Sequence, residues 1–159
     1  MSASQQVMMA GGGGTSYSEF VAHASQASPY VNIYPWSTSG FGTKYANPAT
    51  LPIGTGYSVA FSPAGNAIAV AHDSTPYVSA YPWSTSGFGT KYADPATLPT
   101  GIGRGVAFSP AGDAIAVAHD STPYVSAYPW STSGFGTKYA DPATLPTGNG
   151  ASVSFYKSV

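Results

Sequence analysis

The sequence predicts an all-β protein built from repeated four-stranded units. Three observations carry this prediction: a long segment of the chain recurs almost unchanged, each copy contains four short runs with strand character, and no repeat has helical spacing. From Tyr34 onward, a Pro or Gly interrupts every window of about a dozen residues, the length that a typical helix needs. The 159 residues are enough for one domain with a buried core.

The repeat recurs every 47 residues. Tyr34–Ala80 aligns without gaps on Tyr81–Ala127, and these two copies differ at six positions. A third copy starts at Tyr128, is unchanged as far as Gly148 and then diverges. Near-identity of this kind is typical of a recently amplified repeat or of an engineered one.

The part that the third copy lacks lies at the other end of the chain. Residues 19–33 match it loosely, with His23 placed on His72 and two extra residues inserted before Ser28. The chain is therefore predicted to hold three whole repeats. Their approximate bounds are 34–80, 81–127, and 128–159 together with 19–33.

Each unit contains four runs bounded by turn residues. In the later copies they are Arg104–Ser109, Ala114–His119, Tyr124–Tyr128 and Phe135–Tyr139. Ile115 and Val117 share one face of the second run and its alanines share the other, which is the period of two that a strand requires.

Four short strands at a period of 40 to 50 residues are typical of the blades of a β-propeller. Val106–Gly112, followed by Ile115–Ala118 and a strand with an aromatic end, resembles WD40-like β-propeller repeats. Tyr81 and Tyr128 stand where those repeats have Trp, and the Trp-Asp dipeptide is absent. The copies are also similar to repeat proteins of phages and bacteria and to symmetric propellers engineered from them. The resemblance covers 19–159 and implies three blades per chain.

Composition excludes several classes of function. Only 7% of residues are charged and the net charge is −1, so the chain offers no basic patch for nucleic acid. The sequence contains no run of 18 apolar residues, so we expect no membrane insertion. The absence of cysteine excludes thiolate metal sites. Residues 1–18 are predicted to be a flexible Gly-rich tail, with no positively charged start typical of a secretory signal. The localisation stays open.

His119-Asp120-Ser121 places the residue types of a catalytic triad side by side, as does its earlier copy. Adjacent residues at a strand end rarely reach the mutual geometry that catalysis needs, so we interpret them as turn residues that bind backbone amides. His23, His72 and His119 occur once per repeat, too far apart to share a metal. We therefore expect no enzyme, no catalytic residues, no cofactor and no metal.

Aromatic side chains beside Ser, Thr and Gly form the strongest candidate binding set. Such rings either pack between blades or bind a ligand such as a sugar. Arg104 joins the set as the most distinctive of the six substitutions. The candidates are Trp36, Trp83, Trp130, Tyr34, Tyr81, Tyr128 and Arg104.

The leading functional prediction is a non-enzymatic, self-assembling propeller that serves as a structural or interaction module, on a virion or cell surface if natural. A multivalent glycan-binding lectin with one shallow site per blade is the alternative, and a hydrolase is third. Because closed propellers have about four to eight blades, three blades require homo-oligomerisation. Two copies would give six blades, which we favour, and three would give nine. Val153–Phe155 is predicted to pair with the N-terminal strands and complete the cut repeat.

Overall fold

The computed structural model describes residues 19–158 and is all-β, which confirms the predicted fold class. Its eleven strands form three antiparallel sheets, and the described residues contain no helix that could cross a membrane. The predicted tail at 1–18 lies outside the described residues.

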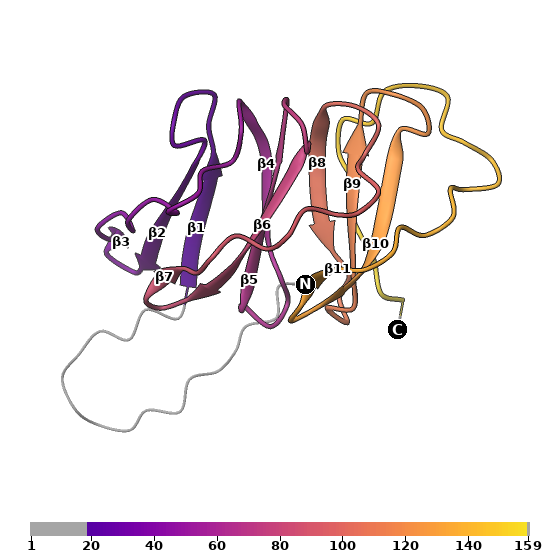
Figure 1. Cartoon of the computed structure of the whole chain (residues 1–159). Helices are drawn as coiled ribbons and strands as arrows, with labels where there is room; N and C mark the ends of the chain where they lie inside the picture. Colours follow the sequence, from indigo (N-terminus) through magenta and orange to yellow (C-terminus); the bar gives the residue numbers. More distant parts are fainter. Residues whose placement is uncertain (1–18, 159) are drawn as a thin grey trace.

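Each sheet is a simple meander in which consecutive strands are neighbours (Figure 1). The first comprises β1 (Glu19–Ala24), β2 (Val31–Ser37) and β3 (Gly40–Phe41). The second comprises β4 (Gly56–Phe61), β5 (Ala67–His72), β6 (Val78–Ser84) and β7 (Gly87–Phe88). The third comprises β8 (Gly103–Phe108), β9 (Ala114–His119), β10 (Val125–Ser131) and β11 (Gly134–Phe135). Among the described residues, the first sheet therefore has no counterpart of the strand that opens the other two.

Two strand ends differ by more than one residue from the sequence expectation. The fourth strand, expected over Phe135–Tyr139, is the two-residue β11, because only Trp130 and Ser131 of β10 find partners in it. β10 continues through Pro129, where we expected it to stop. The Pro129 carbonyl accepts a hydrogen bond from Gly136 N (2.8 Å), and Trp130 N donates to Asp113 O (2.7 Å), so pairing resumes after the missing N–H.

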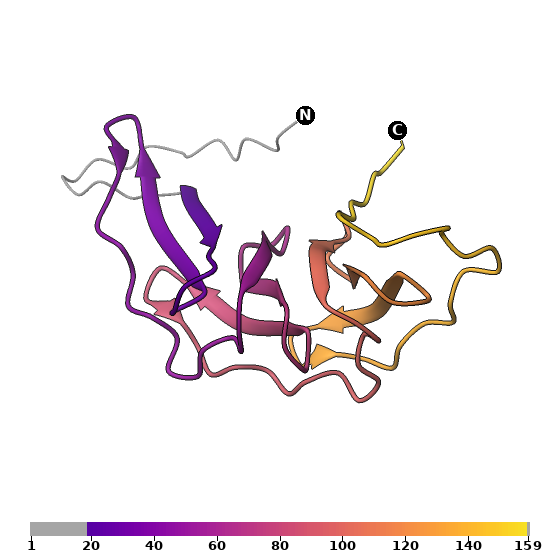
Figure 2. The same cartoon turned by 90° about the horizontal axis from the view of Figure 1, so that it is seen from above.

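The three sheets follow one another along an open arc, with β4 and β8 on its concave side and β7 and β11 on its convex side (Figure 2). One face of each sheet carries bulky side chains and is called the large face. The opposite face of the second and third sheets carries mainly alanine and is called the alanine face. The large face of the second sheet carries Ile68, Tyr81, Trp83 and Phe88 with Val59 and Phe61, and it packs on Phe20, Ala22, Ile33 and Tyr45 of the first sheet and its connector. The alanine face carries Ala67, Ala69, Ala71, Val78 and Ala80.

The junction between the second and third sheets repeats this arrangement. The alanine face of the second sheet packs against Val106, Phe108, Ile115, Val117, Tyr128 and Trp130. These residues are at most 8% exposed, and Ile68 and Val70 are fully buried. Val59 and Phe61 are half-buried.

The first sheet keeps the 47-residue spacing without any insertion, which corrects the looser alignment made from the sequence. Ala24 pairs with Val31 as Ala71 pairs with Val78, and the positive φ angle of Tyr30 recurs at Tyr77 and Tyr124. His23 is therefore the counterpart of Val70 and not of His72, whose counterpart is Ser25. The expectation of one equivalent histidine per repeat was wrong because local sequence similarity outweighed strand register.

We expect Phe108→Ala to lower the free energy of unfolding by about 3–5 kcal/mol, because the ring is buried between two sheets. Denaturant unfolding measures the loss. Ile53→Thr is the matched control, since Ile53 is 54% exposed and the next repeat carries Thr100 there. A loss below about 1 kcal/mol for Phe108→Ala would contradict the assigned packing.

Candidate functional site

The N-terminal end of the arc exposes a large face that has no sheet packed on it within the described chain. Val21, His23, Tyr34 and Phe41 line an apolar hollow of about 420 Å³ on this face. Trp36 lies on the same face and is 37% exposed, whereas its counterparts Trp83 and Trp130 are 5% and 7% exposed. The inner edge of β1 has no neighbouring strand among the described residues.

The C-terminal end exposes the complementary face. The alanine face of the third sheet is more open than that of the second: Ala114, Val125 and Ala127 are half-buried, while the corresponding residues of the second sheet are buried. Tyr139, in the segment after β11, is 49% exposed. Its counterparts at the two internal junctions pack edge-on against tryptophans, Tyr45 on Trp83 and Tyr92 on Trp130, with ring centroids 4.9 and 5.2 Å apart.

Residues 150–155 lie where the inner strand of a further sheet would begin. Gly150 N donates to His119 O (2.9 Å), as Gly56 N donates to Ser25 O (2.9 Å) at the start of β4. A Cβ on Gly150 would lie 2.6 Å from Tyr124 O, and one on Gly56 would lie 2.4 Å from Tyr30 O. The glycine is needed at each position because the backbone of the preceding sheet approaches so closely.

Residues 151–155 lie beside β8 as β8 lies beside β4. A Cβ on Gly105 of β8 would lie 2.8 Å from the Cα of Ser152, so the segment runs directly beside β8. β8 lies beside β4 in the same way, with Val106 N donating to Ser58 Oγ (3.3 Å). Residues 150–155 therefore run where an inner strand would lie, although they form no strand themselves. At the opposite end of the arc lies a sheet that has no inner strand among the described residues (Figure 2).

The structure separates the aromatic candidates into buried and accessible members. Trp83, Trp130, Tyr81 and Tyr128 are buried at the internal junctions. Tyr128 Oη donates to Thr97 O (2.8 Å), and burial raises the pKa of Tyr128 to about 12. Burial also raises the pKa of Tyr81. Trp36 is exposed and Tyr34 half-buried, because the first sheet has no predecessor in the described chain.

Arg104 contacts Tyr57 and Asp120 within the arc. It stands at a register shift between Gly103 and Gly105, where β8 bulges away from β9. Its guanidinium lies over the Tyr57 ring, 4.5 Å from the centroid, and Nη2 lies 3.4 Å from Asp120 Oδ2. Arg104 therefore has no partner residue in the β8–β9 ladder, and neither has its counterpart Tyr57 in the β4–β5 ladder.

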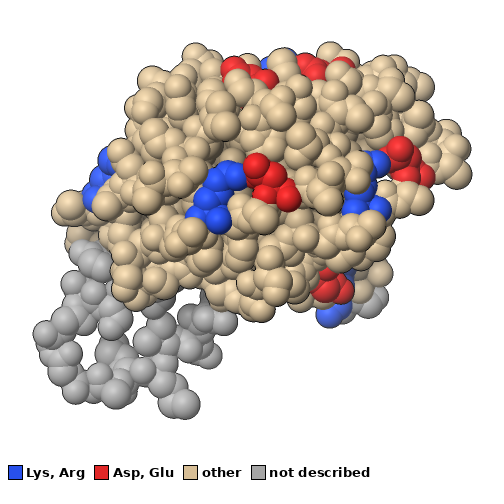
Figure 3. Space-filling view, viewed as in Figure 1, with Lys and Arg blue, Asp and Glu red and all other residues tan. Residues whose placement is uncertain are grey.

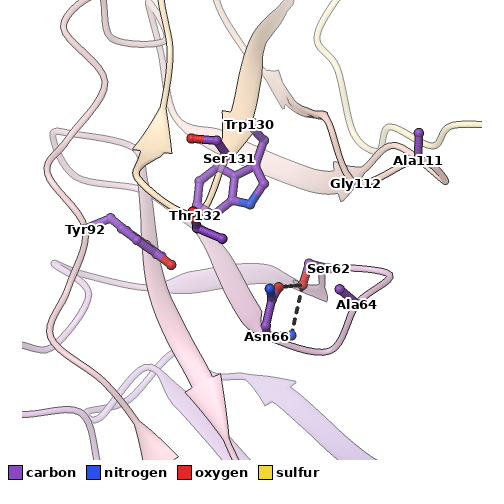
Figure 4. A pocket seen from close by; sticks show the side chains of 9 residues that line it. All are labelled: Ser62, Ala64, Asn66, Tyr92, Ala111, Gly112, Trp130, Ser131 and Thr132. Atoms are coloured by element: carbon purple, nitrogen blue, oxygen red, sulfur yellow. Dashed lines mark hydrogen bonds between the residues drawn. The ribbon is translucent and has the colours of Figure 1, made fainter.

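A second hollow, of about 210 Å³, lies at the junction of the second and third sheets (Figure 4). Trp130, Tyr92, Ser131 and Thr132 contribute an aromatic and hydroxyl lining. Asn66 lies on the opposite wall, where its Oδ1 accepts a hydrogen bond from Ser62 Oγ (2.9 Å).

The His-Asp-Ser runs do not form a relay. His119 Nε2 lies 3.0 Å from Ser126 Oγ, whereas Asp120 Oδ1 accepts from Ile102 N (2.9 Å) and ties the turn to the preceding connector. The earlier copy repeats both contacts through His72–Ser79 and Asp73–Thr55. Among the described residues, no group of three or more acidic or histidine side chains gathers as a metal site. Charged side chains are also sparse on the surface shown in Figure 3.

Gly150 was missed as a candidate residue at the sequence level, because identity with the earlier copies ends at Gly148. At the 47-residue spacing, Gly150 aligns with Gly103, just as Tyr139 aligns with Tyr92. The signal was therefore present in the position of a single glycine, although the surrounding residues had changed.

The buried histidines predict a loss of stability in acid. Burial lowers the pKa of His72 from 6.5 to about 4 and lowers that of His119 as well. Unfolded chains would bind protons that these side chains cannot bind when folded. The stability that these two neutral histidines contribute should be fully present above pH 6.5 and should decline as the pH falls towards 4. For each histidine, the free energy of unfolding should fall by at most about 1.4 kcal/mol per pH unit.

Urea unfolding across this pH range tests the prediction. The double variant His72→Ser/Ser79→Asn is the matched comparison, because it installs the pair that the first sheet carries at Ser25 and Asn32. Its stability should depend less on pH than that of the unmodified chain. Identical pH profiles would contradict the assigned role of His72.

Neither a scan against protein-family models nor a search of curated proteins finds a match to this chain. What the chain does is therefore inferred from the geometry of its two ends.

Proposed function

We propose that the chain is a non-enzymatic, self-assembling segment of a β-propeller that acts as a structural or interaction module. The observation that carries the proposal is the complementarity of its ends. One end presents a large face around Tyr34 and Trp36, and the other presents an alanine face on which Ala114, Val125 and Ala127 are half-buried. A large face packs on an alanine face at the junction of the second and third sheets, and a large face packs on the equivalent side of the first sheet, at Phe20, Ala22 and Ile33, at the other junction.

A head-to-tail contact between two copies would reproduce an internal junction. Trp36 of one copy would meet Tyr139 of another, as Trp83 meets Tyr45 and Trp130 meets Tyr92. Each of these exposed rings would lose its contact with water, which favours association by roughly 25 cal/mol per Å² of apolar surface buried. With only 7% charged residues, little electrostatic repulsion opposes the contact.

Because the two interacting faces differ, the contact is heterologous and forms a ring when the rotation closes. The thin alanine and glycine positions of the inner strands and the aromatic convex side make each blade a steep wedge, which favours fewer blades. Two copies would supply six blades, within the usual range of about four to eight. We therefore propose a closed dimer.

Light scattering on purified protein tests the assembly. Two chains of 16.2 kDa give 32.4 kDa, the expected mass, and three give 48.6 kDa. Trp36→Ala should shift the distribution towards single chains because it removes the largest ring of the exposed large face, while Ile53→Thr should leave it unchanged. A monodisperse species of 16.2 kDa would overturn the proposal.

Glycan binding is a second candidate function, and the hollow beside Trp130 favours it. An aromatic wall next to Ser131, Thr132 and Asn66 offers both an apolar surface and hydrogen-bonding groups, a combination suited to a sugar ring (Figure 4).

A glycan array followed by titration tests this candidate. Binding should disappear in Ser131→Ala/Thr132→Ala, which removes two hydroxyl groups from the hollow, and persist in Thr144→Ala, an exposed residue outside the hollow. If no glycan binds the unmodified chain, or if both variants bind equally, the hollow is a packing gap between blades.

A further inference from the structure

The first sheet is incomplete in a specific way. β1 corresponds to β5 and β9, each of which has an inner strand along one edge and a longer strand along the other. In the described chain β1 has only β2, and the side chains of Val21 and His23 face the hollow on the large face. An exposed edge of this kind is a template for another strand.

The missing strand has a recognisable counterpart at the other end of the chain. Residues 150–155 align with β4 and β8 at the repeat spacing: Gly150 is equivalent to Gly56, Val153 to Val59 and Phe155 to Phe61. They also occupy the corresponding place beside the preceding inner strand, β8. Phe155 is nevertheless 37% exposed and Val153 half-buried, because no second strand lies beside them in the described chain.

We propose that residues 150–155 of one copy form the inner strand of the first sheet of the next copy, antiparallel to β1. This inference rests on the proposed self-assembly and specifies the segment and register through which it occurs. The internal pairs Val59–Val70, Ala60–Ala69 and Phe61–Ile68 set the register. In the junction between copies the corresponding pairs are Val153 with His23, Ser154 with Ala22 and Phe155 with Val21.

The donated strand completes the large face of the first sheet. Val59 and Phe61 stand on the large face of the second sheet, so Val153 and Phe155 reach the same face beside Val21 and His23. The hollow of about 420 Å³ on this face is then covered, on one side by the donated strand and in front by the alanine face of the donor's third sheet. The strand and the face come from the same copy, as they do at each internal junction.

His23 makes this junction differ from the internal ones. The corresponding Val70 and Val117 are fully buried, whereas His23 is exposed in the single chain. Docking would bury the His23 side chain beside Val153 of the donated strand.

Engineered cysteines test the register directly, because the chain has none of its own. His23→Cys/Val153→Cys places two thiols on residues paired in the proposed junction, and His23→Cys/Ser154→Cys is the control with side chains on opposite faces. Val59→Cys/Val70→Cys, paired within the second sheet, shows whether this geometry allows a disulfide. We expect the first variant to give covalent species of 32.4 kDa on a non-reducing gel, and the control to remain at 16.2 kDa.

The outcomes separate this inference from the proposed function. Light scattering of each variant under reducing conditions reports assembly independently of the disulfide. An assembled His23→Cys/Val153→Cys protein that does not cross-link, while Val59→Cys/Val70→Cys does, would overturn the strand placement and leave self-assembly intact. A single-chain mass would overturn both. A disulfide within one chain, or a cross-link only in the opposite-face control, would also overturn the placement.

Discussion

The contact on which the rest of the structure depends is the packing of bulky side chains of one sheet onto the facing side of the sheet before it, which in the second sheet is lined by alanines. Ile115, Val117 and Tyr128 lie against Ala69, Ala71 and Ala80, so two sheets approach closely near the concave side. Trp130 and Phe135 need more space on the convex side, where Tyr92 fills it from the connector. The difference in thickness between the two sides turns a stack of sheets into an arc.

This packing makes every sheet dependent on its neighbours. A single meander of short strands buries one face at most, and its other face carries either exposed aromatic rings or bare alanines. The second sheet, with a neighbour on each side, has the most completely buried β-strand of the molecule, β5. The first and third sheets each retain one open face, and the exposed Trp36 and Phe41 belong to the first of these. Assembly would extend to the ends the same contacts that already stabilise the middle.

The inner strands add a second requirement, which is close backbone approach. Gly103 starts β8 where a Cβ would lie 2.2 Å from Tyr77 O, and Gly105 lets the backbone of Ser152 approach. Buried histidines lie next to this contact: the His72 and His119 side chains each meet a serine hydroxyl, while their Nδ1 atoms are buried without a partner. The first sheet has Ser25 and Asn32 instead, so the repeat tolerates a different polar pair at its most open position.

The sequence by itself determined the all-β class, the 47-residue unit, and nearly all of the central strands. Strand positions follow from local alternation, as in Ala114–His119, and from turn residues, both of which are visible in a short window. The same reasoning located the large side chains of the core, because Ile115 and Val117 fall on one face of a strand. It failed at Pro129 and Tyr139, where pairing with the next segment decides the strand end.

Only the tertiary structure decided which side chains are accessible. Trp36, Trp83 and Trp130 occupy identical local sequences, yet one is exposed and two are buried, because exposure depends on whether a preceding sheet is present. The equivalence of His23 with Val70 likewise required the register of β1 against β2, since local similarity had favoured His72. The place of Gly150 beside the third sheet depends on contacts with residues about thirty positions away, which no local pattern encodes.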